Sequence, residues 1–259
     1  MKTKSTKRLC GLVLAIATCF SLAIAASAAD VEYPGDPSTR TVNGYTYTGW
    51  STLYVGSGYR AGTFVQTANH QMAPAGYIQY QARLFSADGA QLTATDTLTN
   101  RTATDLVATT TRAWPTHNAY SRGWVAYKNA NGHYEAYDLP KTTTIMTRSA
   151  NEIDYDTLMK TLTDNEQYPV NKNGETYGSA LLSDVVGEEP DLIASIGVDG
   201  VEGYVRQDEL HTEYNIPANE EFPIPLYDVD GNVIGSFMLT GVDLEASEAL
   251  ANVIRQNQK

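Results

Sequence analysis

Residues 76–85 read GYIQYQARLF, and this stretch alternates between apolar and polar side chains. An alternation with a period of two is typical of a β-strand that presents one face to a core and the other to solvent. The expected core face carries Ile78, Tyr80, Ala82 and Leu84, and the expected outer face carries Gln79, Gln81 and Arg83. Asp88-Gly89 follows and predicts a turn into a second strand that begins at Gln91.

Two further hairpins are expected in the same part of the chain. Residues 45–54 and 62–68 are rich in Thr, Tyr and Val and form one pair. Residues 123–127 lead through Asn131-Gly132 into residues 133–137 and form the other. These patterns predict a mainly β fold, with a Tyr/Trp-rich antiparallel β-sandwich over residues 43–140. Residues 29–42 are polar with two prolines and are expected to be a flexible lead.

The carboxy-terminal residues 151–259 predict a smaller α+β domain. A helix is expected over residues 153–162, and an amphipathic closing helix follows Asp243, which is its expected cap. Between them, Asn173-Gly174, Asp199-Gly200 and Asp230-Gly231 are expected turns. The strands expected around these turns are residues 192–196, 203–205, 222–227 and 233–239.

The first 28 residues have the pattern of a secretory signal peptide. A basic head precedes an apolar run that ends at Ala26-Ser27-Ala28, a small-residue cleavage pattern. A membrane anchor and lipidation at Cys19 are alternative interpretations. Cys10 and Cys19 both lie inside this segment, so a chain that starts at Ala29 has no thiol for a disulfide, a nucleophile or a metal. The sequence therefore predicts a secreted protein.

The charge of the chain changes abruptly near residues 141–150, which we interpret as a linker. Residues 29–150 carry a net charge of +1, whereas residues 151–259 carry −17. Proteins that bind nucleic acids or anionic membranes carry clusters of Lys and Arg, and the chain beyond residue 28 has none. Neither is therefore an expected partner once the signal segment is removed. The excess acid predicts solubility outside the cell, or attraction of a cationic partner or divalent ions.

Aromatic residues concentrate in the amino-terminal part, which holds all three tryptophans and eleven of the seventeen tyrosines. Such side chains pair across strands, or stack on sugars and anchor protein partners when they are exposed. The aromatic binding candidates of this part are Tyr45, Tyr47, Trp50, Tyr80, Trp124 and Tyr127. The string YPVNKNGETYGS at 168–179 adds Tyr168, Asn171 and Tyr177.

Two parts of the chain resemble known groups of secreted proteins. The order GYTYTGW, PAGYIQYQARLFSADG and YSRGWVAYKNANGHYEAY is similar to small secreted β-domains of Gram-positive anaerobic bacteria, and more distantly to lactococcin-class bacteriocins. The string YPVNKNGETYGS with EEPDLIASIG and GVEGYV resembles modules of secreted Firmicute proteins that are labelled with the β-lactam-sensing regulatory metallopeptidase family. That family's activity requires His-Glu-x-x-His, which this chain lacks, so the resemblance implies an exported module without the peptidase function.

The sequence carries no motif that predicts a particular chemistry, and no catalytic residue, cofactor or metal site is assigned. Asp228, Asp230 and Asn232 have calcium-loop spacing, but Gly231 falls too early, so a hairpin turn is expected. A triad from dispersed residues and a carboxylate pair both stay open. The expected function is a non-catalytic binding protein for a cell-surface polymer or protein. The alternatives are a secreted hydrolase acting on cell-wall or extracellular polymer and a lactococcin-like toxin.

Overall fold

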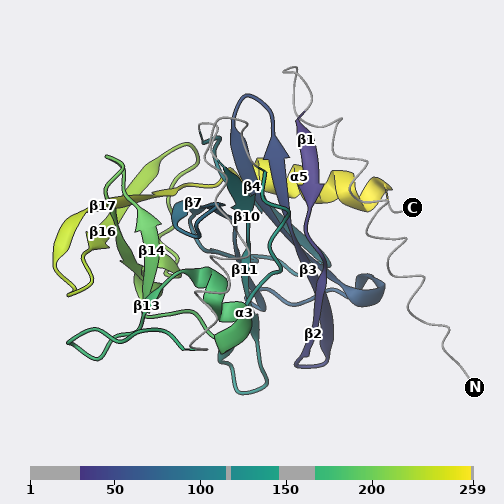
Figure 1. The fold of residues 1–259 in the computed structure, drawn as a ribbon. Coiled ribbons are helices and arrows are strands. Elements are labelled where there is room, and N and C mark those ends of the chain that lie inside the picture. The colour runs from purple at the N-terminus through teal and green to yellow at the C-terminus, as the bar shows by residue number, and fades with distance from the viewer. Residues whose placement is uncertain (1–29, 115–117, 146–166, 258–259) are drawn as a thin grey trace, which may run out of the picture.

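A computed structural model describes residues 30–114, 118–145 and 167–257. Within these ranges the chain forms three β-sheets and a few helices (Figure 1), so the mainly β prediction is confirmed. The helix expected over residues 153–162 lies outside the described residues. No helix in these ranges is long and apolar enough to cross a membrane.

The first sheet is antiparallel and contains the longest strands. Its strands are β1 (Val31–Pro34), β2 (Ser38–Val42), β3 (Tyr45–Val55), β4 (Tyr59–Thr67) and β9 (Leu106–Thr110). The predicted pairing of residues 45–54 with 62–68 is confirmed, since Trp50 lies opposite Phe64 in the β3–β4 register. The prediction of a flexible lead over residues 29–42 is wrong for the described residues, because β1 and β2 both pair with β3. Pro34 and Pro37 fall at or just beyond the end of β1, an edge position where a missing N–H removes no ladder bond.

The second and third sheets are joined by strands that continue from one into the other. The second sheet contains β5 (Ile78–Gln81), β8 (Leu98–Thr99), β11 (Trp124–Lys128) and β12 (Tyr134–Asp138). Only one residue separates β5 from β6 (Arg83–Ser86), and two separate β10 (Ala119–Ser121) from β11. The predicted turns at Gly89 and Gly132 are confirmed, with φ of 89° and 84° at the two glycines.

The first sheet packs against both neighbours through its inner face, as a sandwich. Tyr47 of β3 stacks on Tyr127 of β11, with ring centroids 4.1 Å apart and planes at 2°. Further along β3, Leu53 packs with Leu84 of β6 in a second apolar cluster. The core face predicted for residues 78–84 is therefore confirmed, because Ile78, Tyr80 and Leu84 all face this interior.

The third sheet combines strands from both parts of the chain. Besides β6 and β10 it contains β7 (Gln91–Thr95), β13 (Tyr177–Gly178), β14 (Leu192–Ile196), β15 (Glu202–Arg206), β16 (Glu221–Tyr227) and β17 (Val233–Thr240). The hairpins predicted for residues 192–205 and 222–239 are confirmed. Strand β7 is hydrogen-bonded in parallel to β17 and also to β14, so β7, β17, β16, β15 and β14 form a closed ring.

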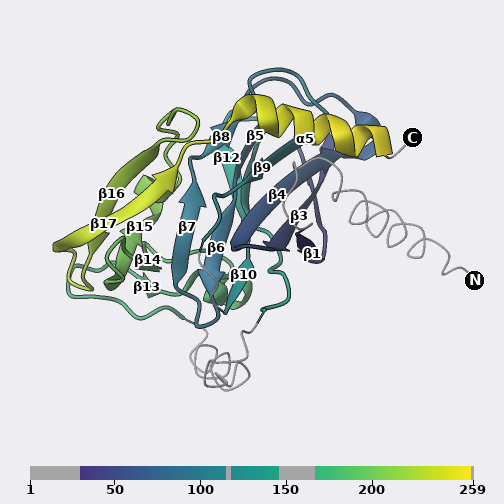
Figure 2. The ribbon, with the colours of Figure 1, turned by 90° about the horizontal axis from the view of Figure 1, so that it is seen from above.

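This ring changes the expected division of the chain. We expected a β-sandwich over residues 43–140 and an α+β domain over residues 151–259, joined by a linker at residues 141–150. The described parts instead share the third sheet (Figure 2). They also share an apolar core in which Phe85 and Tyr120 pack with Ile193 and Leu239. The expected linker also packs in its described portion, where Thr142 is buried and Ile145 bridges to Ala119.

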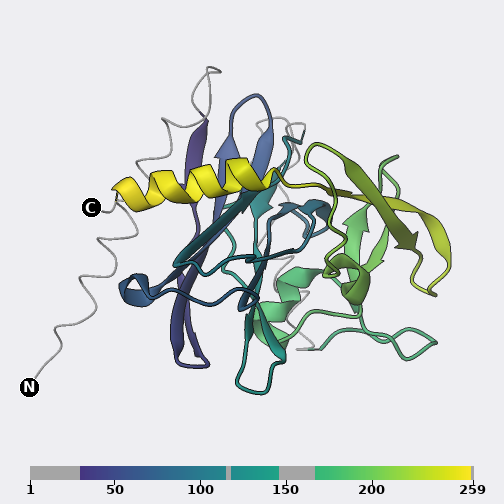
Figure 3. The same ribbon diagram turned by 180° about the vertical axis from the view of Figure 1, so that it is seen from behind.

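One short helix precedes β14, another connects β15 to β16, and a longer one follows β17. The helices are α3 (Ser183–Val186), α4 (Gln207–Leu210) and α5 (Leu244–Asn257). Helix α5 leaves the third sheet after β17 and crosses the outer face of the first sheet (Figure 3). Ala251 and Ile254 are buried there against Trp50 and Phe64. The predicted closing helix is confirmed, and so is its cap, because the Asp243 carboxylate accepts from the Ala246 N–H at 3.0 Å.

Candidate functional site

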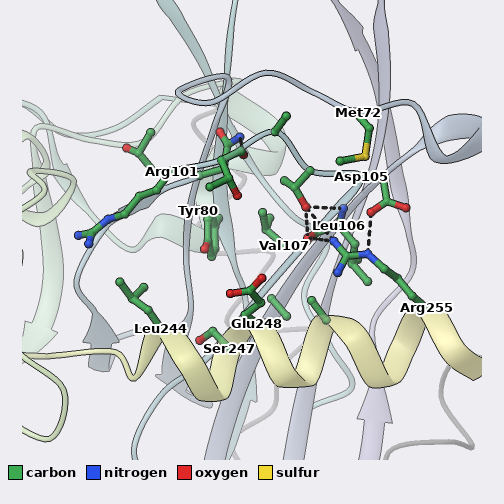
Figure 4. Close-up of a pocket in the computed structure, with 17 residues that line it drawn as sticks. Met72, Tyr80, Arg101, Asp105, Leu106, Val107, Leu244, Ser247, Glu248 and Arg255 are labelled. Carbon is green, nitrogen blue, oxygen red and sulfur yellow. Dashed lines mark hydrogen bonds and ion pairs between the residues drawn. The ribbon is translucent and has the colours of Figure 1, made fainter.

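A cavity of about 580 Å³ lies between α5 and the segment that leads from β8 into β9 (Figure 4). One wall is a single stripe of α5, with Leu244, Ser247, Glu248, Ala251 and Arg255 at positions i, i+3, i+4, i+7 and i+11. Residues at that spacing share one helical face. Glu248 points from the helix into the space toward the opposite wall (Figure 4).

The opposite wall is held rigid by Asn100. Its side-chain oxygen accepts from the N–H groups of Tyr77 and Ile78 at 2.9 and 2.8 Å. Its amide nitrogen donates to the carbonyls of Pro74 and Thr102 at 2.8 and 2.9 Å. All four hydrogen-bonding positions of this buried amide are therefore satisfied, which fixes the wall without any ligand.

An ion pair closes one end of the cavity. Arg255 Nε donates to Asp105 Oδ1 at 2.7 Å, and the guanidinium also donates to the Thr104 hydroxyl and the Leu106 carbonyl. The second oxygen of Asp105 lies 2.9 Å from His70 Nδ1. Burial alone would raise the pKa of Asp105, but the bonds to His70 and Arg255 outweigh it and lower the pKa below its ordinary value. Asp105 is thus a stable carboxylate with both oxygens occupied.

The cavity lining combines apolar surface with neutral polar side chains and four charged residues, Arg101, Asp105, Glu248 and Arg255. The apolar part comes mainly from Met72, Leu106, Val107, Leu244 and Ala251. The neutral polar side chains carry hydroxyl or amide groups and are Tyr80, Thr99, Asn100, Thr102, Thr104 and Ser247. Cavities of this size with a few convergent polar groups are typical of small-ligand sites.

Two further cavities adjoin the first. One of about 530 Å³ lies on the other side of α5, and Ser247 lines both. Another of about 380 Å³ shares Arg101 and Leu244 with the first, and Arg101 donates to the Asn215 side chain at 3.0 Å. Helix α5 is therefore bordered by hollows along most of its amino-terminal half.

A second concentration of charge is buried between the two parts of the chain. We call it the buried ionic cluster, and its members are Arg83, Arg122, Asp138, Glu189 and His211. Asp184, whose side chain is 55% exposed, adds a carboxylate at the edge of the cluster. Arg83 donates to both Asp138 and Glu189, and its side chain is completely buried. Arg122 donates to Asp184 at 2.7 Å and lies 3.5 Å from Asp138.

The two most buried carboxylates of the cluster differ in their electrostatics. Burial and the nearby charge of Glu189 raise the pKa of Asp138, despite both arginines. Burial would also raise the pKa of Glu189, but Arg83 and His211 outweigh it and hold that pKa well below its ordinary value. Divergent pKa values are found at catalytic carboxylates and also in structural ion-pair networks. Because Arg83 binds both groups inside the protein, we assign the cluster a stabilising role.

Most aromatic binding candidates are core residues. Tyr47, Trp50, Trp124, Tyr127 and Tyr168 are all less than 10% exposed, so they do not form an exposed face for a ligand. Other elements cover the faces on which Tyr47, Trp50, Trp124 and Tyr127 lie. Tyr168 lies outside any strand, and its hydroxyl donates to the Ser179 carbonyl at 3.3 Å. Tyr45 is half-buried and packs edge-on against Tyr77.

Tyr80 is the one candidate that lines the cavity, and the candidates of the string YPVNKNGETYGS have structural roles. Asn171 donates to the Val229 carbonyl at 2.8 Å, and Asn173 donates to the Asp230 carbonyl at 2.7 Å. The string therefore docks on the β16–β17 turn. Tyr177 of β13 contacts Tyr204 of β15 edge-on, on either side of β14.

Sequence reasoning missed the residues that build the cavity, although one signal was present. The stripe Leu244, Ser247, Glu248, Ala251 and Arg255 runs beside the apolar stripe of the closing helix. Such a mixed stripe predicts that one side of a helix borders a polar space rather than a core. Nothing local indicated that residues 99–108 would face it.

No protein-family model, no curated protein and no solved structure matches this chain. The resemblances of the sequence to secreted modules therefore stay predictions. Within residues 30–114, 118–145 and 167–257, no group of three or more His, Cys, Asp or Glu side chains is placed to hold a metal ion.

Proposed function

We propose that this protein is a secreted, non-catalytic binding protein, and that the cavity beneath α5 binds a short sugar-containing fragment of a cell-surface polymer. The export pattern of residues 1–28 supports the extracellular location. The observation that carries the ligand class is the lining, in which the hydroxyl-bearing side chains of Tyr80, Thr102 and Ser247 lie beside apolar surface. The Asn100 amide and the Thr99 and Thr104 hydroxyls are engaged within the protein and shape the wall. Sugars present hydroxyl groups around apolar ring faces, and this lining complements both.

The charges at the cavity favour binding over catalysis. A general acid or base needs a pKa near the working pH and a free hydrogen-bonding position. Asp105 has a lowered pKa and both oxygens engaged. Glu248 extends from an exposed helical face and is suited to accept hydrogen bonds from ligand hydroxyl or amine groups (Figure 4).

The proposal is tested by nuclear magnetic resonance titration of the chain from Ala29 onward. The probes are the tetramer of N-acetylglucosamine and a muramidase digest of peptidoglycan. We expect saturable shifts of backbone amides in residues 99–108 and 244–251. Shifts confined to other surfaces, or none at millimolar probe, would contradict the assignment.

A matched pair of variants separates the cavity from general charge effects. Glu248→Gln is expected to weaken binding by about fivefold to tenfold, because it removes a charged acceptor. Glu202→Gln makes the same change on exposed β15, outside the cavity lining, and is expected to leave binding unchanged. Equal effects of the two variants would show that net charge, not the cavity, governs binding.

A further inference from the structure

The second cavity, of about 530 Å³, is bordered by one side of α5 and by strands of the first sheet. Its wall on α5 is apolar and consists of residues at positions i, i+3, i+4 and i+7, which are Ala246, Ala249, Leu250 and Val253. Residues at that spacing share one helical face. The first two are exposed and the last two are partly buried, whereas Ala251 and Ile254 occupy the buried positions against the sheet. Helix α5 therefore presents a second apolar stripe, which borders this cavity.

Aromatic rings lie on the first sheet at the floor of the second cavity. A Cβ at Gly62 of β4 would lie 2.9 Å from ring atoms of both Tyr54 and Phe64, so these rings occupy the space above the glycine. Tyr54 lines the cavity, and Phe64 packs in the cluster that α5 covers. Because Gly62 has no side chain, the rings can rest against the sheet. The floor thus adds aromatic surface to the aliphatic surface of the helical wall.

Two arginines on neighbouring strands also line the second cavity. Arg60 lies opposite Tyr54 in the β3–β4 register. The Thr111 N–H donates to the Ala61 carbonyl at 2.9 Å, which continues the β4–β9 ladder and brings Arg112 beside Arg60. The third charged residue of the lining is an acid, the α5 cap described above. The lining itself therefore carries two positive charges and one negative charge.

Each arginine has a carboxylate partner that lies outside the lining. Arg60 donates to Asp30, and both side chains are mostly buried. Arg112 donates to Glu221 at 2.9 Å and to the Asn219 carbonyl, one bond from each terminal nitrogen, and its side chain is 40% exposed. A guanidinium has five N–H donors, and solvent weakens an exposed pair of this kind. Arg112 therefore keeps donors for a further carboxylate. Since the partners and the helix cap together supply three acids, a bound carboxylate would depend on direct contact with Arg112 rather than on net charge.

We propose that the second cavity binds an unbranched aliphatic chain that ends in a carboxylate, the chemistry of a medium-chain fatty acid. The chain lies between the apolar stripe of α5 and the ring of Tyr54, and the carboxylate accepts hydrogen bonds from Arg112. The volume of the cavity falls in the range typical of small-molecule sites. Because only Ser247 lines both cavities, this site stands independently of the sugar site proposed for the first cavity.

Nuclear magnetic resonance titration of the chain from Ala29 onward tests the proposal. The probes are octanoate and decanoate, each kept below its micelle concentration. We expect saturable shifts of backbone amides in residues 110–112 and 246–253. Decanoate is expected to bind about tenfold more tightly than octanoate, because two more CH₂ groups are buried. Shifts that do not saturate, shifts confined to residues 99–108 of the first cavity, or equal affinity of the two probes would overturn the proposal.

The head group is tested with decyltrimethylammonium, which has the same chain and the opposite charge. We expect it to bind about fivefold more weakly than decanoate or worse, and Arg112→Met to weaken decanoate by about fivefold. Arg40→Met removes an exposed arginine of β2 outside the cavity lining and is expected to leave decanoate binding unchanged. Equal affinity for the two head groups, or equal effects of the two variants, would contradict the assignment of the carboxylate to Arg112.

The position of the chain is tested on α5 itself. Ala249→Glu places a charge in the apolar stripe and is expected to weaken decanoate binding by about tenfold or more. Gln256→Glu adds the same charge at an exposed position of the helix outside the lining of both cavities and is expected to have no effect. Equal losses in the two variants would overturn the placement of the chain. If Ala249→Glu does not fold, the comparison of octanoate with decanoate on the unaltered chain still decides.

Discussion

Arg83 and Glu189 lie 106 positions apart in the sequence and form an ion pair that is almost completely buried. Burial of the charged guanidinium and carboxylate costs several kcal/mol for each group, which only good geometry repays. Removing one partner leaves the other charge without compensation. The pair therefore joins the two parts of the chain in a way that a single substitution can break.

Arg83→Met is expected to destabilise the protein by about 3–5 kcal/mol, because Glu189 and one carboxylate oxygen of Asp138 lose their buried partner. The measurement is the urea unfolding free energy at pH 7. Arg112→Met is the matched control, since Arg112 pairs with Glu221 on the surface with both side chains at least 40% exposed. Its expected cost is below about 1 kcal/mol. Similar losses of unfolding free energy in both variants would show that the buried pair contributes no more to stability than the exposed pair.

Acidification is expected to destabilise the protein through Asp105 and Glu189. Both carboxyl groups have lowered pKa values in the folded state. Their contribution is present above the ordinary carboxyl pKa and is lost as pH falls through the folded values, so the loss begins below about pH 4.5. Asp105→Asn is expected to lower the urea midpoint at pH 7 and to reduce its further fall between pH 5 and pH 3. An unchanged acid-induced fall in this variant would rule out the assigned role of Asp105.

Arg255→Met is expected to loosen the carboxy-terminal half of α5. The substitution removes charge-assisted bonds to Asp105 and Thr104, whose removal costs about 1.5–3 kcal/mol. Hydrogen exchange of the amides in residues 251–257 is the measurement, and it is expected to accelerate at least tenfold. Gln256→Met on the exposed side of the same helix serves as the control. Equal protection in the two variants would mean that packing of Ile254 alone holds the helix.

Gly241→Ala tests the close approach between the end of β17 and the segment after α4. A Cβ at position 241 would lie 1.9 Å from the Pro217 carbonyl oxygen, so backbone must move. The expected cost is about 1–3 kcal/mol in urea unfolding. Gly235→Ala within β17 meets its nearest atom at 3.6 Å and is expected to change stability far less. If the two substitutions cost the same, the contact at Pro217 is not tight in solution.

The hairpins could be predicted because their information is local. The turns at Gly89, Gly132 and Gly231 each combine an Asn or Asp with a glycine of positive φ, and strands of matching period flank them. The same holds for the closing helix, whose cap at Asp243 and apolar spacing are contained within a few turns.

The pairing between distant strands and the cavity could not be predicted in this way. Alternation in residues 76–85 assigned Gln81 and Arg83 to an outer face, and both are completely buried. That face is covered by Leu210, His211 and Glu189, more than 100 positions later in the chain. The prediction that most of the aromatic candidates bind a ligand was wrong for the same reason. A local pattern does not distinguish an exposed sheet face from one that another sheet covers.

Strand β7 closes the ring with β14 and β17 although it precedes them by about 100 residues or more. A chain cut between residues 141 and 145 would leave one piece holding β7 and the other holding the remaining strands of the ring. Neither piece could complete its hydrogen-bond ladder, so each would recover its structure only by finding the other. This geometry makes the protein a candidate for fragment complementation, in which two separately produced pieces regain their structure only when they meet and complete the shared ring.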